Sequence, residues 1–525
     1  MDAAQPQWRI LDTGFGAGLD FLAALQAWRD NPARPRPLHY FSVVTPDARL
    51  ASPLAGRLQG LTPGVHRFLF EDGRVVLTLA VGDLQAALRE QEFNADAVIL
   101  QGGAADLATI KAVTRLCRTG TSLQASEATA QEHLRTCGWQ VEPDALRATY
   151  LPRWTVRRLP RTEQQPQHCV VVGAGLSGAA VAASLARRGW QVEVLDAGTH
   201  PAGGASSLPV GLLAPHQSPD DNLLSRLSRA GVRVTLQECA LRLAAGEQWA
   251  LSGALEVRGD DARALPSLPG LAPWSCEAAG SDKSAATLPQ STQAWWHANA
   301  AWVKPSALVQ AWLAQPGVVF RGNTAVARIE RDDAGWEVLD ARGDVTARAP
   351  LVVVAAAHAS AVLLGHRITT HPVRGQVSWN VGNAGALPPF PVNGHGHFMP
   401  NVPTPEGIAW FSGSTYGRQD PDGSLRTEDD AANLQRIREL LPQVGETLAA
   451  DFTGGRVRSW AGVRCASPDR RPLVGEVEPG LWVSTAMGSR GLTFAALCAE
   501  LIAARLHAEP LPLPVRLAQA LDVKR

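Results

Sequence analysis

The stretch CVVVGAGLSGAAVAASLARRGWQVEVLDAG, residues 169–198, decides the fold of the larger part of this chain. It begins with four apolar residues, which are typical of a strand buried on both faces of a parallel sheet. Gly173, Gly175 and Gly178 follow in G-x-G-x-x-G spacing and open an alanine-rich segment of good helix formers. A second apolar run ends on Asp196. This order of strand, glycine turn, helix, strand and acid predicts a dinucleotide-binding unit.

Each residue of this pattern has its own physical role. Gly173 permits a tight turn, Gly175 lets the backbone approach a pyrophosphate, and Gly178 lets the helix pack on the strand. The helix N-terminus offers free N–H groups and a partial positive charge to that pyrophosphate. Asp196 stands where a carboxylate accepts hydrogen bonds from the ribose hydroxyls of an adenosine. A glycine-rich turn without a ligand is the alternative interpretation of the three glycines alone.

Composition excludes several classes of protein. The chain has 525 residues, more than one hydrophobic core accommodates, so we expect two or three domains. Its formal net charge is zero, so no overall basic charge indicates that the protein binds nucleic acid. A local basic patch is still compatible with this composition. Seven cysteines without zinc spacing or a C-x-x-C pair favour free thiols and no metal. With no signal region and no apolar run of transmembrane length, we expect a cytoplasmic protein without membrane contact.

The N-terminal part carries a second strand, glycine turn and helix, in residues 7–22, QWRILDTGFGAGLDFL. The G-x-G-x-G pattern is the usual opening of a class I S-adenosylmethionine (SAM) methyltransferase, and any other nucleotide-binding turn is the alternative. Residues 75–80 predict a strand that leads to an acid placed near an adenine. Alternating strands and helices make residues 1–150 an α/β domain. The residues that would contact SAM are Asp12, Gly14, Gly16, Gly18 and Asp83.

Residues 151–167, LPRWTVRRLPRTEQQPQ, look like a linker with three prolines and no apolar periodicity. Its arginines permit two interpretations, a solvated connector or a patch that contacts RNA phosphates. The arginines are Arg153, Arg157, Arg158 and Arg161.

Residues 168–525 predict a second domain, in which a β-rich substrate subdomain at about 217–460 interrupts the nucleotide-binding part. Small residues after the fingerprint let the backbone pass close to a flat ligand. Near the C-terminus, a strand, a glycine turn and a helix place a second helix N-terminus near the cofactor. Besides the first fingerprint, the expected contacts are Gly204, Ala205, Ser206, Gly488, Ser489, Gly491 and Leu492.

Several motifs together carry a resemblance to a known family. They are DTGFGAGLDFL (12–22), VVVGAGLSGAAVAASLARRG (170–189), GGASSLPVGLLAP (203–215), RGQVS (374–378), RCASPDRRPLVGE (464–476) and AMGSRGLTFAAL (486–497). With them the chain resembles the bifunctional tRNA 5-methylaminomethyl-2-thiouridine biosynthesis (MnmC) family over nearly its whole length. Its second part resembles glycine oxidase and D-amino-acid oxidase.

The resemblance implies an enzyme that modifies the wobble uridine of tRNA. The family's FAD domain oxidatively removes the carboxymethyl group from 5-carboxymethylaminomethyl-(2-thio)uridine, and its methyltransferase domain methylates the exposed amine from SAM. The substrate therefore ends in an N-substituted glycine, whose carboxylate needs a cation. A guanidinium binds a carboxylate bidentately and stays charged when buried. By motif position Arg464 resembles the carboxylate-binding arginine of glycine oxidase, Arg490 is the second candidate, and a structural salt bridge is the alternative for either.

The methyltransferase half departs from its family. Residues 43–45, VVT, stand where the family has a Phe-Glu-Lys-like stretch whose acid would hold the SAM ribose. Residues 100–103, LQGG, stand where it has Leu-Asp-Gly-Phe. Gln101 cannot accept a proton from the amine, and Val44 cannot bind ribose. We therefore expect a degenerate domain without methyl transfer, kept as a tRNA-binding or scaffold module.

The flavin half departs less, with Ser207-Leu208-Pro209 in place of the family's Gly-Asn-Pro. Three functions stay open at this point. The first is a FAD-dependent oxidase of tRNA, the second an oxidase of a free small amine, and the third a non-catalytic RNA-binding relative. The sequence does not specify an oligomeric state, and a monomer is compatible with it.

Overall fold

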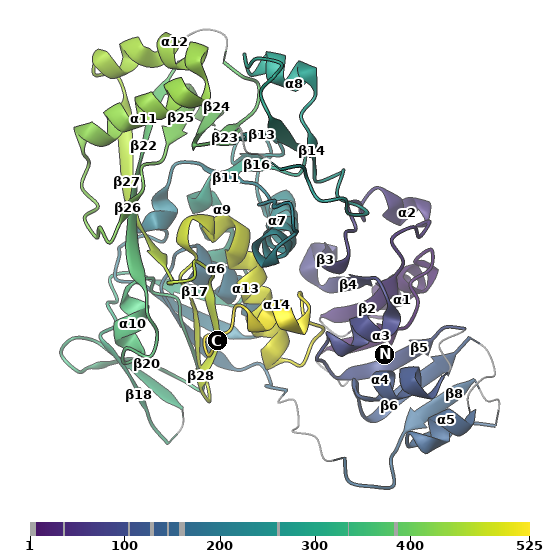
Figure 1. Ribbon diagram of the computed structural model, residues 1–525. Helices are drawn as coiled ribbons and strands as arrows, with labels where there is room; N and C mark the ends of the chain where they lie inside the picture. Colours follow the sequence, from purple (N-terminus) through teal and green to yellow (C-terminus); the bar gives the residue numbers. More distant parts are fainter. Residues whose placement is uncertain are drawn as a thin grey trace. The chain divides into compact units, whose positions relative to one another are not determined.

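The computed structural model describes residues 7–34, 37–102, 106–126, 131–143, 146–156, 163–259, 263–333, 335–382 and 387–525 (Figure 1). The chain divides into two compact units. Unit 1 comprises Met1–Pro166, Leu268–Gly270 and Glu500–Ala520. Unit 2 comprises Gln167–Ser267, Leu271–Ala499 and Leu521–Arg525. Each unit contains helices and one largely parallel sheet, so the α/β fold class expected from the sequence is confirmed.

Unit 1 is built on an eight-stranded sheet with a parallel centre. β1 pairs in parallel with β2 and β5, β2 with β4, and β5 with β6. The two ends of the sheet are antiparallel, β3 to β4 on one side and β8 to β6 and β7 on the other. In sheet order the strands are β3 (Gly64–Phe70), β4 (Val75–Val81), β2 (Leu38–Val44), β1 (Trp8–Asp12), β5 (Ala95–Leu100), β6 (Cys117–Ala125), β8 (Arg147–Tyr150) and β7 (Trp139–Val141).

Two apolar clusters cover the two faces of this sheet. Phe21, Leu25 and Trp28 of α1 belong to one cluster, while Ile110 and Val113 of α4 belong to the other. Burial on both faces explains why the central strands are continuous apolar runs. The helices are α1 (Leu19–Asp30), α2 (Ser52–Ala55), α3 (Leu84–Arg89), α4 (Leu107–Thr114), α5 (Gln131–Thr136) and α14 (Val515–Gln519), with a 3-10 turn η1 (Glu71–Gly73).

The segment Glu500–Ala520 belongs to unit 1, although the sequence places it with the domain at 168–525. Two buried contacts hold it there, one of them an ion pair. Arg67 Nη1 lies 3.0 Å from Glu500 Oε2, and His39 Nε2 lies 3.3 Å from Glu509 Oε1, with all four side chains almost completely buried. A charge that is buried needs its partner, so this segment has one favourable position in unit 1.

Unit 2 contains a six-stranded sheet that carries the glycine fingerprint. β9 pairs in parallel with β10 and β21, β10 with β17, and β21 with β29, whereas β28 is antiparallel to β29. In sheet order the strands are β17 (Val318–Arg321), β10 (Gln191–Leu195), β9 (His168–Val172), β21 (Leu351–Val354), β29 (Leu481–Thr485) and β28 (Leu473–Glu478). The helices α6 (Leu176–Ala186) and α13 (Gly491–Leu506) begin beside this sheet, after β9 and β29.

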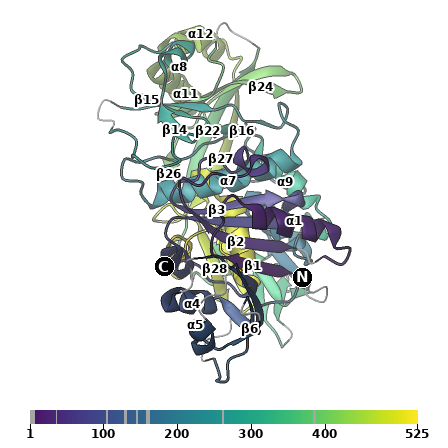
Figure 2. The same cartoon turned by 90° about the vertical axis from the view of Figure 1, so that its right-hand side faces the viewer.

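A second sheet of unit 2 has nine strands and lies under two helices, α11 (Thr427–Leu440) and α12 (Pro442–Thr453). Figures 1 and 2 show both helices beside β24, and buried Ile437, Leu440 and Val444 join them to the core of the sheet. The strands are β14 (Ser275–Glu277), β15 (Ala294–His297), β13 (Ala254–Val257), β23 (Val392–Gly394), β24 (Gly396–Thr404), β25 (Gly407–Gly413), β22 (His371–Val381) and β26 (Gly417–Arg418), with β27 (Arg458–Ala466) paired to β22.

Two small sheets and several helices complete unit 2. No helix in the described ranges is long and apolar enough to cross a membrane. The remaining elements are β11 (Gly211–Leu213), β16 (Ala301–Val303), β12 (Trp249–Ala250), β18 (Arg328–Arg331), β19 (Trp336–Leu339), β20 (Val345–Ala349), α7 (Leu223–Arg242), α8 (Gly280–Ala285), α9 (Pro305–Leu313), α10 (Ala359–Leu363), η2 (Ala205–Ser207) and η3 (Gly488–Arg490).

Candidate active site

The glycine turn after β9 has the close approaches that its spacing predicts. Gly173 has φ +109°, and a Cβ there would lie 2.5 Å from the Ala355 carbonyl oxygen. A Cβ on Gly178 would overlap the Gly173 carbonyl oxygen, and one on Gly175 would lie 3.2 Å from Ser206 Oγ. A side chain at Gly178 would therefore push the helix away from the strand, and a side chain at Gly173 would collide with the segment that follows β21.

The starts of α6 and α13 are neighbours in unit 2. A Cβ on Gly491, the first residue of α13, would lie 3.2 Å from Leu176 Cδ1 at the start of α6. The Leu176 N–H donates to Ser206 Oγ at 3.0 Å, so the segment after Gly204 also reaches this point. Two helix N-termini that meet combine their positive ends and favour an anionic ligand.

Asp196, which follows β10 directly, stabilises the glycine turn through hydrogen bonds. Its carboxylate accepts hydrogen bonds from the Ala174 N–H at 2.7 Å and the Gly198 N–H at 2.8 Å. A carboxylate oxygen has more than one lone pair, so these bonds leave capacity for ribose hydroxyls. The side chain is half-buried, which leaves it within reach of a ligand.

Arg464 lies on β27 and is surrounded by neutral groups. Its Nη1 donates to Ser489 Oγ at 2.8 Å, which joins two residues that the sequence singled out separately. Its Cζ lies 5.4 Å from the centre of the Tyr416 ring. Its Nη2 donates to three further acceptors, Thr415 O at 3.2 Å, Arg374 O at 3.3 Å and Ser414 Oγ at 3.3 Å.

The charge of Arg464 has no counterion among the residues that the structure describes, and the same holds for Arg490. Burial lowers the pKa of both guanidinium groups, only partly opposed by Tyr416. Arg470 lowers the pKa of Arg490 further. Both side chains are half-buried, and a cation that is partly removed from water and faces no carboxylate favours an anionic ligand. The structural salt bridge considered for either arginine is therefore not found within the described ranges.

Gly375 makes room for Arg464. β22 and β27 are antiparallel, with Gly375 opposite Gly462 and Val373 opposite Arg464. A Cβ on Gly375 would overlap Arg464 Nη2. The glycine of the RGQVS motif is thus required by a side chain that comes from a distant part of the sequence.

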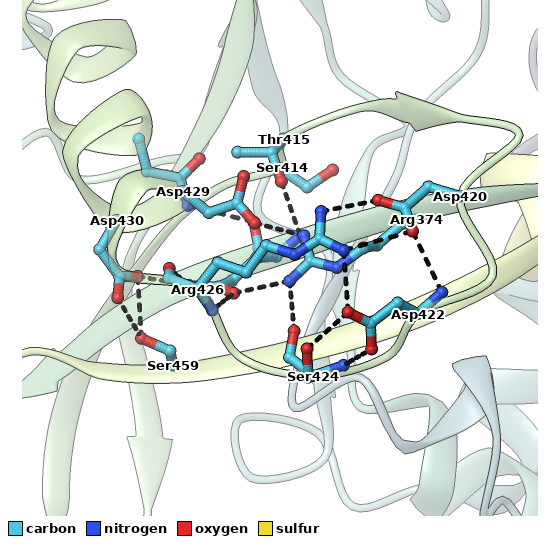
Figure 3. Close-up of polar contacts among 12 residues, drawn as sticks. Arg374, Ser414, Thr415, Asp420, Asp422, Ser424, Arg426, Asp429, Asp430 and Ser459 are labelled. Carbon is cyan, nitrogen blue, oxygen red and sulfur yellow. Dashed lines mark hydrogen bonds and ion pairs between the residues drawn. The ribbon is translucent and has the colours of Figure 1, made fainter.

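The polar residues of the same motif bind the segment that follows β25 (Figure 3). The Gln376 N–H donates to Thr415 Oγ1 at 3.0 Å, and its Nε2 donates to Asp430 Oδ1 at 3.0 Å. Arg374 is 2% exposed and forms an ion pair with Asp429. β22 therefore fixes residues 414–430, from which the Thr415 carbonyl reaches Arg464.

Two histidines lie in the electrostatic field of the arginines. Burial together with Arg464 and Arg436 lowers the pKa of His397 to about 4. Burial and then Arg490 lower the pKa of His216. Both imidazoles are neutral at pH 7, so the arginines supply the positive charge. From the sequence alone, a surface or structural role is the favoured interpretation of both histidines.

In unit 1, Asp12 is buried and its carboxylate is occupied by internal donors. It accepts from the Gly14 N–H at 3.0 Å and from the hydroxyls of Tyr40 and Ser42 at 2.9 Å each. Burial raises the pKa of Asp12 to about 6.

Gln101 lies against the N-terminal glycine turn. Its Nε2 donates to Asp20 Oδ2 at 2.8 Å and to Asp12 Oδ1 at 3.5 Å. A Cβ on Gly14 would lie 3.3 Å from the Gln101 Cβ. The amide thus uses the carboxylate of Asp12, which the sequence assigned to SAM.

The other residues assigned to SAM make contacts that serve the local fold. Gly16 and Gly18 have φ of +52° and +86°, and a Cβ on Gly18 would overlap Leu54. Asp83 is the N-cap of α3 and accepts from the Ala86 N–H at 2.8 Å. Gly103 and the linker residues Arg157, Arg158 and Arg161 lie outside the described residues.

Comparison with known proteins identifies the family. Residues 168–505 match the FAD dependent oxidoreductase family (DAO). The tRNA 5-methylaminomethyl-2-thiouridine biosynthesis bifunctional protein MnmC of Polaromonas sp. (strain JS666 / ATCC BAA-500) is 48% identical over 99% of this chain and 91% of its own length. That of Delftia acidovorans (strain DSM 14801 / SPH-1) is 45% identical over 100% of this chain and 92% of its own. The chain belongs to the MnmC family.

Solved structures share the fold of the MnmC oxidoreductase part. Iminodiacetate oxidase (IdaA) from Chelativorans sp. BNC1 matches with a TM-score of 0.52 and 23% identity, over 66% of this chain and 97% of its own. Glycine oxidase from Bacillus cereus ATCC 14579 matches with a TM-score of 0.53 and 21% identity, over 65% of this chain and 94% of its own. The expected DAO-type fold is confirmed, and FAD is the cofactor of this family. The methyltransferase-like nature of residues 1–150 stays a prediction.

Proposed function

We propose that this MnmC-family protein oxidises the wobble uridine of tRNA. It removes the carboxymethyl group from 5-carboxymethylaminomethyl-(2-thio)uridine and leaves 5-aminomethyl-(2-thio)uridine. The relatives are named for the biosynthesis of 5-methylaminomethyl-2-thiouridine in tRNA, and the FAD dependent oxidoreductase family covers most of the chain. The observation that carries the proposal is Arg464, a half-buried guanidinium that pairs with no carboxylate in the described ranges.

The residues of unit 2 fit FAD. Gly173 and Gly178 allow close backbone approach, and two helix N-termini suit the pyrophosphate and an anionic flavin. When bound, FAD accepts a hydride from the carbon beside the amine nitrogen, and water hydrolyses the resulting imine to glyoxylate and the aminomethyl nucleoside. The residues proposed to hold FAD are Gly173, Gly175, Gly178, Asp196, Gly204, Ala205, Ser206, Gly488, Ser489, Gly491 and Leu492.

Arg464 would position the substrate through its carboxylate. The hydrogen bonds to Ser489 and Thr415 hold the guanidinium in place before the substrate binds, so little side-chain freedom is lost on binding. Arg490 adds a second positive charge at the start of α13. Together they favour an anionic substrate over a neutral amine.

The test is nucleoside analysis of tRNA that carries the carboxymethylaminomethyl group, incubated with the purified holoenzyme. We expect conversion to the aminomethyl nucleoside together with release of glyoxylate. Free glycine tested in parallel should give no glyoxylate. Glyoxylate from glycine but not from tRNA would indicate an oxidase of free amines, and no product from either would indicate a non-catalytic relative.

For unit 1, we propose that methyl transfer from SAM has been lost. The supporting observation is Gln101, whose amide bonds to Asp12 and Asp20 beside the glycine turn, while the buried Val44 offers no group to a ribose. Adding SAM to the same incubation should leave the product unmethylated. A methylaminomethyl nucleoside formed only with SAM would contradict this proposal.

The partner that this function requires is tRNA, and we propose that the protein acts on it in the cytoplasm. The relatives' named role in tRNA biosynthesis supports the partner. Size-exclusion chromatography with light scattering, with and without tRNA, tests whether the protein binds tRNA and measures the oligomeric state.

A further inference from the structure

Tyr416 is an exposed aromatic side chain directly beside the proposed carboxylate site. The residue is 45% exposed, although the Arg464 Cζ lies only 5.4 Å from its ring centre. Tyrosine is intermediate in burial among the residue types, and it is enriched among the residues that contribute most to binding a partner. This ring is therefore available to whatever part of the substrate extends beyond the carboxylate.

The backbone on both sides of Tyr416 is fixed. Thr415 accepts from Arg464 through its carbonyl at 3.2 Å and from the Gln376 N–H through its hydroxyl at 3.0 Å. On the other side, Gly417 pairs with Arg374 on β22. An exposed ring on an anchored backbone loses little conformational freedom when a partner binds.

Arginine side chains lie near the ring. The Arg418 Cζ lies 5.9 Å from the ring centre, and Arg490 is close enough for Tyr416 to influence its pKa. Arg418 and Arg490 form no ion pair with a carboxylate in the part of the chain that the structure describes. Aromatic rings among unpaired guanidiniums are the combination that binds bases and phosphates of single-stranded nucleic acid.

We propose that Tyr416 is the specificity-determining residue that stacks on the uracil base carrying the N-substituted glycine. This inference rests on the proposed function, because it assigns the base of the same substrate whose carboxylate binds Arg464. A free amino acid has a carboxylate and an amine but no base, so the ring favours the nucleoside over the small amine. Arg418 lies beside the ring and would meet the adjoining phosphate.

The experiment compares Tyr416→Ala with Tyr416→Phe in the holoenzyme. Under anaerobic conditions, the rate of flavin bleaching is measured against the concentration of tRNA that carries the carboxymethylaminomethyl group. For Tyr416→Ala, we expect the concentration for half-maximal rate to rise about 5- to 150-fold, the range for losing one base-aromatic stack. The limiting rate should stay within about twofold of wild type, and Tyr416→Phe, which keeps the ring, should behave like wild type.

Two controls separate stacking from a structural role. Leu425→Ala removes another exposed apolar side chain of the 414–430 segment and should leave the tRNA dependence unchanged. Acetate, a carboxylate without a base, is used as a competitor of bleaching, and its inhibition constant should be the same for Tyr416→Ala and wild type.

Three results would overturn the inference. If the tRNA concentration for half-maximal bleaching of Tyr416→Ala were within twofold of the wild-type value, stacking would be excluded. If the inhibition constant of acetate increased as much as the half-maximal tRNA concentration, the ring would only support Arg464. If tRNA does not bleach the wild-type flavin, the proposed function itself fails, and that outcome is distinct because it appears before any substitution.

Discussion

Arg464 Nη2 occupies the space that a Cβ on Gly375 would fill. The two residues are on paired strands, β22 and β27, and the guanidinium passes over the glycine to reach the Thr415 carbonyl at 3.2 Å. The position of the proposed carboxylate-binding charge is thus set by the absence of a side chain on the neighbouring strand.

Gly375→Ala should displace this guanidinium without removing it. We expect FAD to remain bound, because none of the glycine-turn residues is touched, while the tRNA concentration for half-maximal flavin bleaching rises about 10- to 100-fold. Ala461→Gly, on the same strand pair, is the matched control for a one-methyl change. Wild-type behaviour of Gly375→Ala would mean that Arg464 has other productive positions.

Arg464→Ala should remove the carboxylate partner itself. The loss expected for one partner of a buried charge pair is about 2–5 kcal/mol of substrate binding, with the flavin content unchanged. Arg464→Lys keeps the charge but loses the bidentate geometry, so it should recover only part of that loss. Titration of flavin bleaching with tRNA measures both, and a wild-type titration for Arg464→Ala would disprove the carboxylate assignment.

The dinucleotide fingerprint could be predicted because all its parts are local. Gly173, Gly178 and Asp196 lie within one strand-helix-strand unit, so their spacing predicts the turn, although the atom nearest to Gly173 belongs to the distant Ala355. The apolar run at 351–357 forms a strand only as far as Val354, and Ala357 has φ +49°.

The contacts that complete the site depend on strand register over long distances. Nothing near Gly375 in the sequence indicates that Arg464 lies over it, because 89 positions separate them and only the pairing of β22 with β27 joins them. The same reason explains why the sequence does not predict that the segment Glu500–Ala520 belongs to unit 1. Its place in unit 1 depends on Arg67 and His39, whose ion partners cannot be recognised without the fold.

Asp196→Ala should weaken the retention of FAD. The substitution removes the proposed ribose acceptor and also the acceptor for the Ala174 and Gly198 N–H groups. Asp196→Asn keeps one acceptor oxygen and should retain more flavin. The flavin-to-protein ratio after dialysis measures the effect, and a fully flavinated Asp196→Ala would contradict the ribose role.

Gln101→Glu should destabilise unit 1, and the loss should grow with pH. The pKa of the buried Asp12 is raised to about 6, so this group keeps its proton in the folded state at pH values where the unfolded chain has lost it. Its contribution therefore makes folding less favourable as pH rises from about 4 to 6. A glutamate at position 101 replaces a donor to Asp12 and Asp20 with a third carboxylate, which adds repulsion once the groups are ionised. Urea unfolding of the full chain should show an additional loss of about 1–2 kcal/mol at pH 8 compared with pH 5, the effect of roughly one pKa unit. The exposed Gln124→Glu on β6 is the matched control. An equal loss at both pH values would show that the Gln101 amide does not screen these two carboxylates from each other.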